Sequence, residues 1–359
     1  METAFTGASS LRPPQHDGKL ITQEGRYGMN RIKYIPLFVV AVSIAAVVTW
    51  LINDPLQLWV TKNQIQQYPN KTVELIVSFK EGGGTDIGAR LLAGYLEQEL
   101  NQFVKIHNVD GYDGEVGFER LAKADPDGYT IGFINLPTFI SLPIQRKTAY
   151  QVKDVQLIAN YVLDPAVLLV RSDSPWMTFE EWLEECRQKP LHMTVSNNGV
   201  GASNHIAAAY LAYEAEIELT HVPFGGTTDM LKALEEGYVS ASVAKVSEVA
   251  QGVQQGDFRV LASFTEERLP VFDDVPTLRE NGYDISFGSA RALAVPVKTP
   301  KEIVKKIEKA FYAAYTNPEH LEDAEKISLP LFYMDQEDVR IYIRQQEQYL
   351  REVLPLIGL

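Results

Sequence analysis

Short apolar runs alternate with amphipathic stretches along the chain from residue 68 onward. Apolar or β-branched runs of four to eight residues between turn signals are typical of strands, whereas apolar residues three and four positions apart indicate helices. We therefore predict alternating strands and helices, hence mainly parallel sheets of the open α/β kind. The predicted strands are 73–79, 103–109, 129–135, 166–172, 191–197, 217–223, 259–264 and 292–296.

Helical spacing occurs between these strands, for example at Ile87, Leu91 and Tyr95. It also occurs in a long polar C-terminal stretch, where Ile341, Leu350 and Val353 are expected to face the core. Open α/β sheets bind ligands in crevices at the carboxyl ends of their strands. The loops that follow the predicted strands are therefore where a functional site is expected.

A membrane-directed segment precedes this pattern. Residues 34–52 contain no charged side chain and come close to the roughly 20 residues needed to span a bilayer. Arg26, Arg31 and Lys33 lie before the segment, so the positive-inside tendency exports the part of the chain that follows. The run is longer than a secretory h-region, which favours an uncleaved anchor over a cleaved peptide. We predict a cytoplasmic tail at 1–33, a transmembrane or signal-anchor segment at 34–52, and a polar linker at 53–67.

The charge balance excludes some partners. The chain carries 33 Lys and Arg against 47 Asp and Glu, for a net charge of −14. Residues 68–359 hold 27 basic and 43 acidic side chains, which makes a nucleic-acid partner unexpected. Cys186 is the only cysteine, so neither an intrachain disulfide nor a multi-cysteine zinc site is possible. We expect no metal and no cofactor, and an anionic ligand would have to be attracted by local geometry.

A glycine-rich loop offers such geometry. In SFKEGGGTDIGAR (78–90) an apolar strand leads into three consecutive glycines, then Thr85 and Asp86, then a helix. Glycines allow close backbone approach, and the N–H groups and dipole of a helix N-terminus suit an anion. We expect Thr85 or Asp86 to cap the helix. The segment is neither a phosphate P-loop nor a GxGxxG dinucleotide motif.

Two further segments repeat this arrangement. TVSNNGVGASNH (194–205) reads as strand, glycine-containing loop and helix start, with Ser203 or Asn204 as the expected cap. HVPFGGTTD (221–229) has paired glycines followed by two threonines, and either Thr227 or Thr228 is the expected cap. Two or three helix N-termini directed into one cleft would make a carboxylate site without net positive charge.

Charged and catalytic candidates leave alternatives open. Lys245 and Arg291 lie near apolar runs, where either cation could pair with a ligand carboxylate or with an acidic neighbour. An envelope hydrolase could use Ser196 or Ser203 with His205, although the chain has no GxSxG elbow and no HExxH pair. A third possibility is an interaction module that binds no small ligand.

Several ordered motifs carry a family resemblance. YPNKTVELIVSFKEGGGTDIGARLLAGYLEQEL (68–100) resembles the start of the mature Bug family, the extracytoplasmic receptors of tripartite tricarboxylate transporters. The later motifs follow in family order: DPDGYT (125–130), the 196–203 loop, HVPF (221–224), DVPT (274–277) and 296–300. The resemblance covers about 68–359 and implies an α/β, two-domain periplasmic-binding-protein fold of the type II, flytrap kind. It implies domain 1 at 68–168 and 289–359 and domain 2 at 169–288, with crossovers near 166–170 and 285–292.

The resemblance also implies a function. The chain is expected to bind a small di- or tricarboxylate-like ligand without chemistry, as a monomer, on the extracytoplasmic side of a bacterial inner membrane to which its N-terminal helix anchors it. The expected partners are the membrane subunits of a tripartite tricarboxylate transporter, or a signalling protein. Family loops match Gly83, Gly84, Thr85 and Asp86 on one side and Ser196, Asn198, Gly201 and Ser203 on the other, and the predicted ligand-binding set also includes Asn135, Lys245 and Arg291.

The chain departs from the family pattern at three places. Lys80 and Glu81 stand where the family usually has prolines. Residues 107–114, HNVDGYDG, form an acidic version of a usually basic and glycine-rich stretch. Lys245 stands where many members have a small or polar residue.

Overall fold

The computed structural model describes residues 65–359. The predicted cytoplasmic tail and the membrane segment at 34–52 lie outside the described residues, and both stay predictions. Within 65–359, no helix combines the length and the apolar character needed to cross a membrane.

Ten strands of the described residues form two sheets that share one long strand, β4 (Val155–Arg171). The first sheet has the order β2-β1-β3-β9-β4 with β10 also beside β4, and the second continues β4-β7-β5-β6 with β8 also beside β4. The other strands are β1 (Val73–Val77), β2 (Val104–Asn108), β3 (Thr130–Leu136), β5 (Thr194–Asn197), β6 (Thr220–Pro223), β7 (Ala241–Lys245), β8 (Phe258–Ser263), β9 (Gly288–Pro296) and β10 (Leu331–Met334).

The α/β class is as predicted, but the sheets are less parallel than predicted. β1 pairs in parallel with β2 and β3, and β5 pairs in parallel with β6 and β7. All pairings of β4 and β9 are antiparallel. The reason is topological, since the chain passes from the first sheet to the second along β4 and returns to the first along β9.

The length of β4 was not predicted. Only 166–172 was expected as a strand, because Asn160, Asp164 and Pro165 interrupt the apolar pattern before it. The structure buries the first two of these side chains completely. The Asn160 amide donates to the Val162 and Phe332 carbonyls at 3.0 and 2.7 Å, so this buried group bonds both β4 and the neighbouring strand β10, while Asn160 Oδ1 has no partner among the described residues. The first sheet takes β4 residues up to Pro165 and the second takes Ala166 onward.

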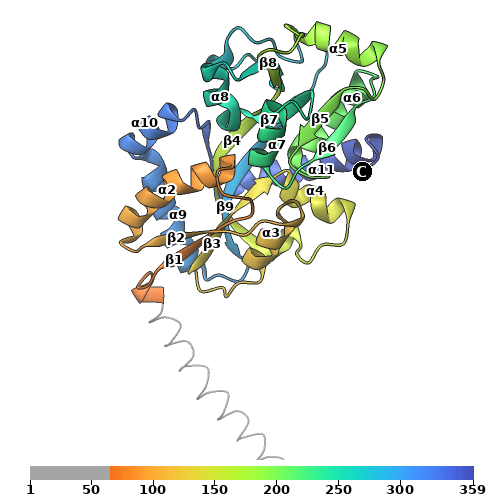
Figure 1. Cartoon of the computed structure of the whole chain (residues 1–359). Helices are drawn as coiled ribbons and strands as arrows, with labels where there is room; N and C mark the ends of the chain where they lie inside the picture. Colours follow the sequence, from red (N-terminus) through yellow and green to blue (C-terminus); the bar gives the residue numbers. More distant parts are fainter. Residues whose placement is uncertain (1–64) are drawn as a thin grey trace, which may run out of the picture. The chain divides into compact units, whose positions relative to one another are not determined.

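Helices cover both sheets (Figure 1). α2, α9 and α10 pack together against the first sheet, α7 and α8 pack on the second, and α11 contacts β4, α4 and α6. The helices are α2 (Gly84–Leu100), α3 (Glu115–Ala122), α4 (Thr138–Gln145), α5 (Phe179–Gln188), α6 (Ser203–Glu214), α7 (Thr227–Glu235), α8 (Val246–Gln255), α9 (Lys301–Thr316), α10 (Pro318–Lys326) and α11 (Gln336–Leu356), with short 3₁₀ turns at Tyr112–Gly114, Val152–Asp154 and Pro270–Phe272.

The predicted C-terminal helix is α11, and its core-facing stripe differs at one residue. Leu350 and Val353 are buried, as the pattern required. Ile341 is 40% exposed, so its assignment to the core was wrong. The buried stripe instead begins at Val339 and Ile343, four residues apart and on one helix face. The division into two domains stays a prediction.

Candidate functional site

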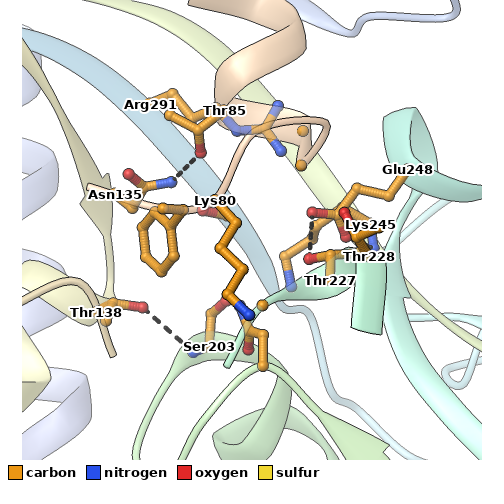
Figure 2. Close-up of a pocket in the computed structure, with 16 residues that line it drawn as sticks. Lys80, Thr85, Asn135, Thr138, Ser203, Thr227, Thr228, Lys245, Glu248 and Arg291 are labelled. Carbon is orange, nitrogen blue, oxygen red and sulfur yellow. Dashed lines mark hydrogen bonds between the residues drawn. The ribbon is translucent and has the colours of Figure 1, made fainter. Parts of the chain in front are cut away.

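A pocket lies where the two sheets meet (Figure 2). The first sheet and its helices provide the loop after β1, the start of α2, the end of β3, the start of α4, and β9; the second provides the loop before α6 and the starts of α7 and α8. The wall consists of Phe79, Lys80, Gly83, Gly84, Thr85, Asn135, Thr138, Asn198, Ser203, Gly226, Thr227, Thr228, Lys245, Glu248, Ser289 and Arg291.

Three of these helices begin without a side-chain cap. The N-cap residues are Gly83 for α2, Ala202 for α6 and Gly226 for α7, and none makes a side-chain cap hydrogen bond. The predicted caps, Thr85 or Asp86, Ser203 or Asn204, and Thr227 or Thr228, were therefore wrong, because glycine or alanine occupies each cap position instead. Backbone N–H groups of a first turn are unsatisfied unless a cap, water or ligand accepts from them. Uncapped helix starts around one pocket suit an anion.

Arg291 is one of three cations in the pocket wall, and it already has a counter-charge. Its Nη2 lies 2.7 Å from Asp164 Oδ2, and both side chains are almost fully buried. Ser247 supports the pair, since its backbone N–H donates to Asp164 Oδ1 at 3.2 Å and its hydroxyl donates to Oδ2. The guanidinium lies against Gly84, where a β-carbon would overlap its Nη2. Arg291 Nε has no hydrogen-bond partner among the described residues.

Lys80 is also paired, but near the surface. Its Nζ lies 2.6 Å from Asp229 Oδ2 in α7, and the two side chains are 43% and 48% exposed. The pair joins the loop after β1 to a helix of the second sheet. The hydrogen bond to Asp229 raises the pKa of Lys80. Exposed pairs of this kind contribute roughly 0–1 kcal/mol, so the contact is easily broken.

Lys245 differs from the other two cations. Its side chain is 2% exposed, and its ammonium donates to the Asn204 side-chain oxygen rather than to a carboxylate of the described residues. Burial lowers its pKa to about 8, while Glu248 and Asp164 oppose the shift and Arg291 adds to it. Lys245 directly precedes α8, where a cation faces the positive end of the helix dipole. A buried ammonium in that place is costly unless an anion pairs with it directly.

Glu248 faces the pocket but is occupied by the protein. Its Oε1 accepts from the Thr227 hydroxyl at 2.9 Å, and its Oε2 accepts from the Lys245 backbone N–H at 2.9 Å (Figure 2). On the opposite wall, the Asn135 amide donates to the Thr85 hydroxyl at 2.6 Å, and Asn135 Oδ1 is buried without a partner among residues 65–359. An unpaired acceptor of this kind can take a hydrogen bond from a hydroxyl or amine of a ligand.

The cavity is small. Its volume is about 30 Å³, which corresponds to roughly two water molecules. Lys80 extends across it from above, and Arg291 fills the space beside Gly84 (Figure 2). A carboxylate of even a few carbon atoms therefore enters only if the two walls separate or these side chains move.

Asp86, a predicted ligand contact, lies behind the wall. Its Oδ2 accepts from Gly82 N–H at 2.9 Å and from Arg90 Nε at 2.8 Å, and its Oδ1 accepts from the Asn108 amide at 2.9 Å. Burial raises its pKa, but the hydrogen bonds from Arg90, Gly82 and Asn108 outweigh burial and bring it below the ordinary value. Asp86 thus fixes the glycine loop rather than lining the cavity.

Ser196 and Gly201 also lie outside the wall. The Ser196 hydroxyl is buried against the Ser242 hydroxyl. Gly201 donates its N–H to His205 Nδ1 at 3.0 Å, so this His205 nitrogen bonds the loop backbone rather than a serine. Burial, with a contribution from His221, lowers the pKa of His205 to about 4. The neutral imidazole thereby holds the loop in shape, and the Ser–His pair of the hydrolase alternative is not formed.

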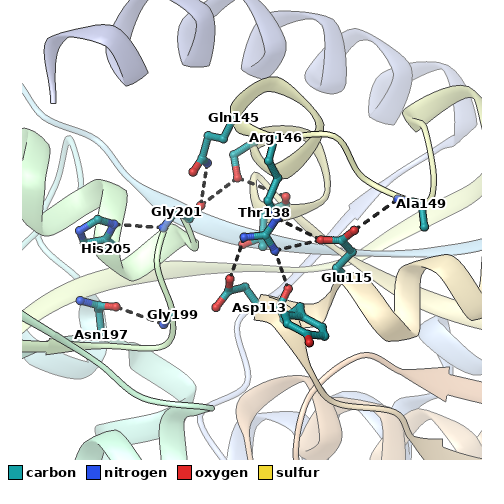
Figure 3. A network of polar contacts seen from close by, with 12 residues as sticks. Asp113, Glu115, Thr138, Gln145, Arg146, Ala149, Asn197, Gly199, Gly201 and His205 are labelled. Atoms are coloured by element: carbon teal, nitrogen blue, oxygen red, sulfur yellow. Dashed lines mark hydrogen bonds and ion pairs between the residues drawn. The ribbon is translucent and has the colours of Figure 1, made fainter. Parts of the chain in front are cut away.

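A second polar network connects α4 to the loop before α6 (Figure 3). The Ser141 hydroxyl donates to the Gly201 carbonyl at 2.9 Å, and Thr138 Oγ1 accepts from Ser203 N–H at 3.3 Å. Beside them, Arg146 binds Asp113 and Glu115 at 3.3 and 3.0 Å. Burial raises the pKa of Asp113, although Arg146 opposes it. The acidic stretch 107–114 therefore contributes a structural carboxylate, outside the pocket wall.

Sequence reasoning missed part of the wall. It did not include Phe79, Lys80, Thr138, Glu248 or Ser289 among the candidates. The third glycine loop gave a signal for Gly226, Thr227 and Thr228, since it repeats the strand, glycine and threonine order of the first. Glu248 gave none, because an acidic residue three positions into a helix is common.

Comparisons with known proteins agree with the geometry. The profile described as "Tripartite tricarboxylate transporter family receptor" (TctC) matches residues 88–359. The UPF0065 protein in the gbd 5′ region of Cupriavidus necator is 29% identical over 297 residues, which cover 82% of this chain and 90% of that protein.

Solved structures show the same likeness. The periplasmic binding protein BugD aligns with a TM-score of 0.77 and 26% identity, over 81% of this chain and 99% of that chain. MatC from Rhodopseudomonas palustris with bound malate aligns with a TM-score of 0.74 and 26% identity, over 80% of this chain and 100% of that chain. The α/β fold is of the periplasmic-binding-protein kind, and the chain belongs to the Bug/TctC family of tripartite tricarboxylate transporter receptors.

Proposed function

We propose that this receptor binds a small di- or tricarboxylate in the pocket between its two sheets and delivers it, unchanged, to the membrane subunits of a tripartite tricarboxylate transporter. One observation carries the proposal: Lys245 is a buried ammonium with no carboxylate partner among the described residues, in the wall of a pocket at which uncapped helices begin. A ligand carboxylate would supply the direct charged contact that this ammonium lacks.

The balance of charge around the pocket supports a ligand with more than one carboxylate. The three cations of the wall, Lys80, Lys245 and Arg291, are matched in number by Asp229, Glu248 and Asp164. Formal charges therefore cancel, and the remaining positive potential comes from the uncapped starts of α2, α6 and α7. At roughly +0.5 charge each, three helix ends would offset more than one negative charge.

The malate bound to MatC is a dicarboxylate and favours the same ligand class for this receptor. The unpaired Asn135 oxygen would accept from a ligand hydroxyl beside the carboxylate. We infer an extracytoplasmic location from the family, and a membrane anchor at 34–52 from the sequence alone.

A ligand screen tests the proposal. The full chain would be melted with di- and tricarboxylates, acidic amino acids and aromatic acids, and with the neutral amide of each acid as a matched control. Binding to the native state raises the melting temperature by an amount that grows with ligand concentration. We expect shifts with acids and none with their amides, a 1:1 stoichiometry by calorimetry, and recovery of intact ligand. Equal shifts with the amides, or turnover of the ligand, would refute the proposal.

A further inference from the structure

A second cavity lies on the other face of the strand pair that bears the carboxylate pocket. β4 and β9 pair through Asp164 with Ser289 and through Pro165 with Gly288. Successive strand residues point to opposite faces. Ser289 and Arg291 accordingly line the carboxylate pocket, while Leu163, Pro165 and Gly288 line the second cavity.

This second cavity is large enough for a small molecule. Its volume is about 210 Å³, whereas an apolar protein cavity of roughly 150 Å³ holds benzene. It is several times larger than the carboxylate pocket, at about 30 Å³. The half-buried α11 residues Tyr342, Gln346 and Tyr349 form its outer wall.

The chemistry of the walls restricts the ligand class. None of the residues that line the cavity is charged, so an ionic ligand would lose its hydration without gaining a counter-charge. Phe264, Phe287, Tyr342 and Tyr349 offer four aromatic rings, and Phe287 and Tyr349 already pack with ring centroids 6.4 Å apart. Burial raises the pKa of Tyr342 to about 12, with no contribution from a hydrogen bond or a charge. The Gln346 amide adds a donor and an acceptor.

We propose that this cavity is a second ligand site, which binds a neutral aromatic molecule bearing an amide or hydroxyl group, and that its occupation changes the affinity of the carboxylate pocket. The coupling follows from the shared strands. A molecule held against Leu163, Pro165 and Gly288 restrains the same stretch of backbone that positions Asp164 and Arg291 on the opposite face.

Benzamide is a suitable probe, because it is neutral, planar and only slightly larger than benzene. We expect saturable binding to the full chain with a dissociation constant on the order of 1 mM or tighter, followed by ligand-observed NMR. Gln346→Trp, which fills the cavity, should weaken binding more than about tenfold. Gln345→Trp is the matched control, since Gln345 is the exposed neighbour on the same helix and lies outside the wall.

Tyr342→Phe provides a milder variant, which keeps the ring and removes only the hydroxyl. It should weaken benzamide binding by about threefold to tenfold. Absence of saturable binding, or equal affinity in wild type, Gln346→Trp and Tyr342→Phe, would overturn the second site.

The coupling is measured separately, by titrating the carboxylate found in the screen with and without saturating benzamide. We expect its dissociation constant to change by about fivefold or more, and by reciprocity benzamide affinity must change by the same factor. An unchanged carboxylate affinity would refute the coupling. Benzamide binding needs no carboxylate, so failure of the proposed transport function would leave the second site standing.

Discussion

At the scale of single residues, the proposed carboxylate site depends on Lys245. Replacing Lys245 with methionine keeps a long side chain and removes the buried charge. We expect carboxylate affinity to fall about tenfold to hundredfold, as loss of a charged hydrogen bond would predict. The ligand-free protein should melt at the same temperature or higher, because an unpaired buried charge is destabilising. Calorimetry and thermal unfolding measure both effects.

Lys232→Met is the control, since the Lys232 side chain is 68% exposed on α7. The same affinity loss in both variants would contradict a direct role for Lys245. The pKa adds a second readout. Only the protonated amine attracts a carboxylate, so wild-type affinity should fall as pH rises above about 8, and this dependence should vanish in Lys245→Met.

Stability should show the opposite pH dependence. The folded-state pKa of about 8 lies below the ordinary value of 10.5. The unfolded chain therefore binds more protons between these values, and the free protein gains stability as pH rises through that interval.

Residue patterns in the sequence predicted loops better than side-chain directions. Three consecutive glycines identified Gly83 and Gly84 as wall residues because the signal concerns backbone space. Asp86 occupies the same motif, yet its side chain turns back to the Gly82 N–H and to Arg90. A sequence specifies which groups are near in the chain, whereas this orientation depends on Asn108 in β2, which is distant in sequence.

At the scale of elements, the helix starts were predictable and the central strands were not. A strand followed by glycine and a polar residue marks a helix N-terminus locally, and α2, α6 and α7 all begin there. β4 carries Asp164 at its middle, where periodicity argues against a buried strand. The long-range contacts with Arg291 and Ser247 make that burial possible. β7 was missed because ASVAK is short and leads directly into α8.

The close contact between α2 and β9 gives a prediction. A β-carbon at Gly84 would overlap the Arg291 guanidinium and lie 3.0 Å from Glu248 Cγ. Gly84→Ala should therefore displace Arg291 from Asp164 and reduce carboxylate affinity by tenfold or more, because a buried pair is disturbed. Calorimetry would measure the loss. Gly94→Ala on the same helix meets open space and should stabilise the protein by up to about 1 kcal/mol. Similar behaviour of the two variants would contradict the assigned packing.

At the scale of the whole molecule, the proposed function requires an acidic body to bind an anion. The net charge of −14 repels carboxylates at long range, but at physiological salt this repulsion is screened beyond about 8 Å. Inside the pocket, helix ends and a buried ammonium determine the local potential. The sequence could predict the family and the need for such local attraction. It could not predict that the described arrangement leaves only about 30 Å³ between the walls.

A pocket too small for the proposed ligand implies that opening precedes binding, and this sets an expectation for the kinetics. The observed binding rate should rise with carboxylate concentration and then reach a plateau equal to the opening rate, because ligand enters only after the walls separate. The Lys80–Asp229 ion pair crosses from one wall to the other at a distance of 2.6 Å and must break in that step. Asp229→Asn should therefore raise the plateau, by no more than about fivefold for so exposed a pair. Stopped-flow fluorescence would follow the change.

Glu235→Gln, an exposed substitution on the same helix, serves as the control and should leave the plateau unchanged. A rate that stays linear in ligand at all concentrations would mean that the carboxylate enters without opening, and the side chains of Lys80 and Arg291 would then have to move aside on their own.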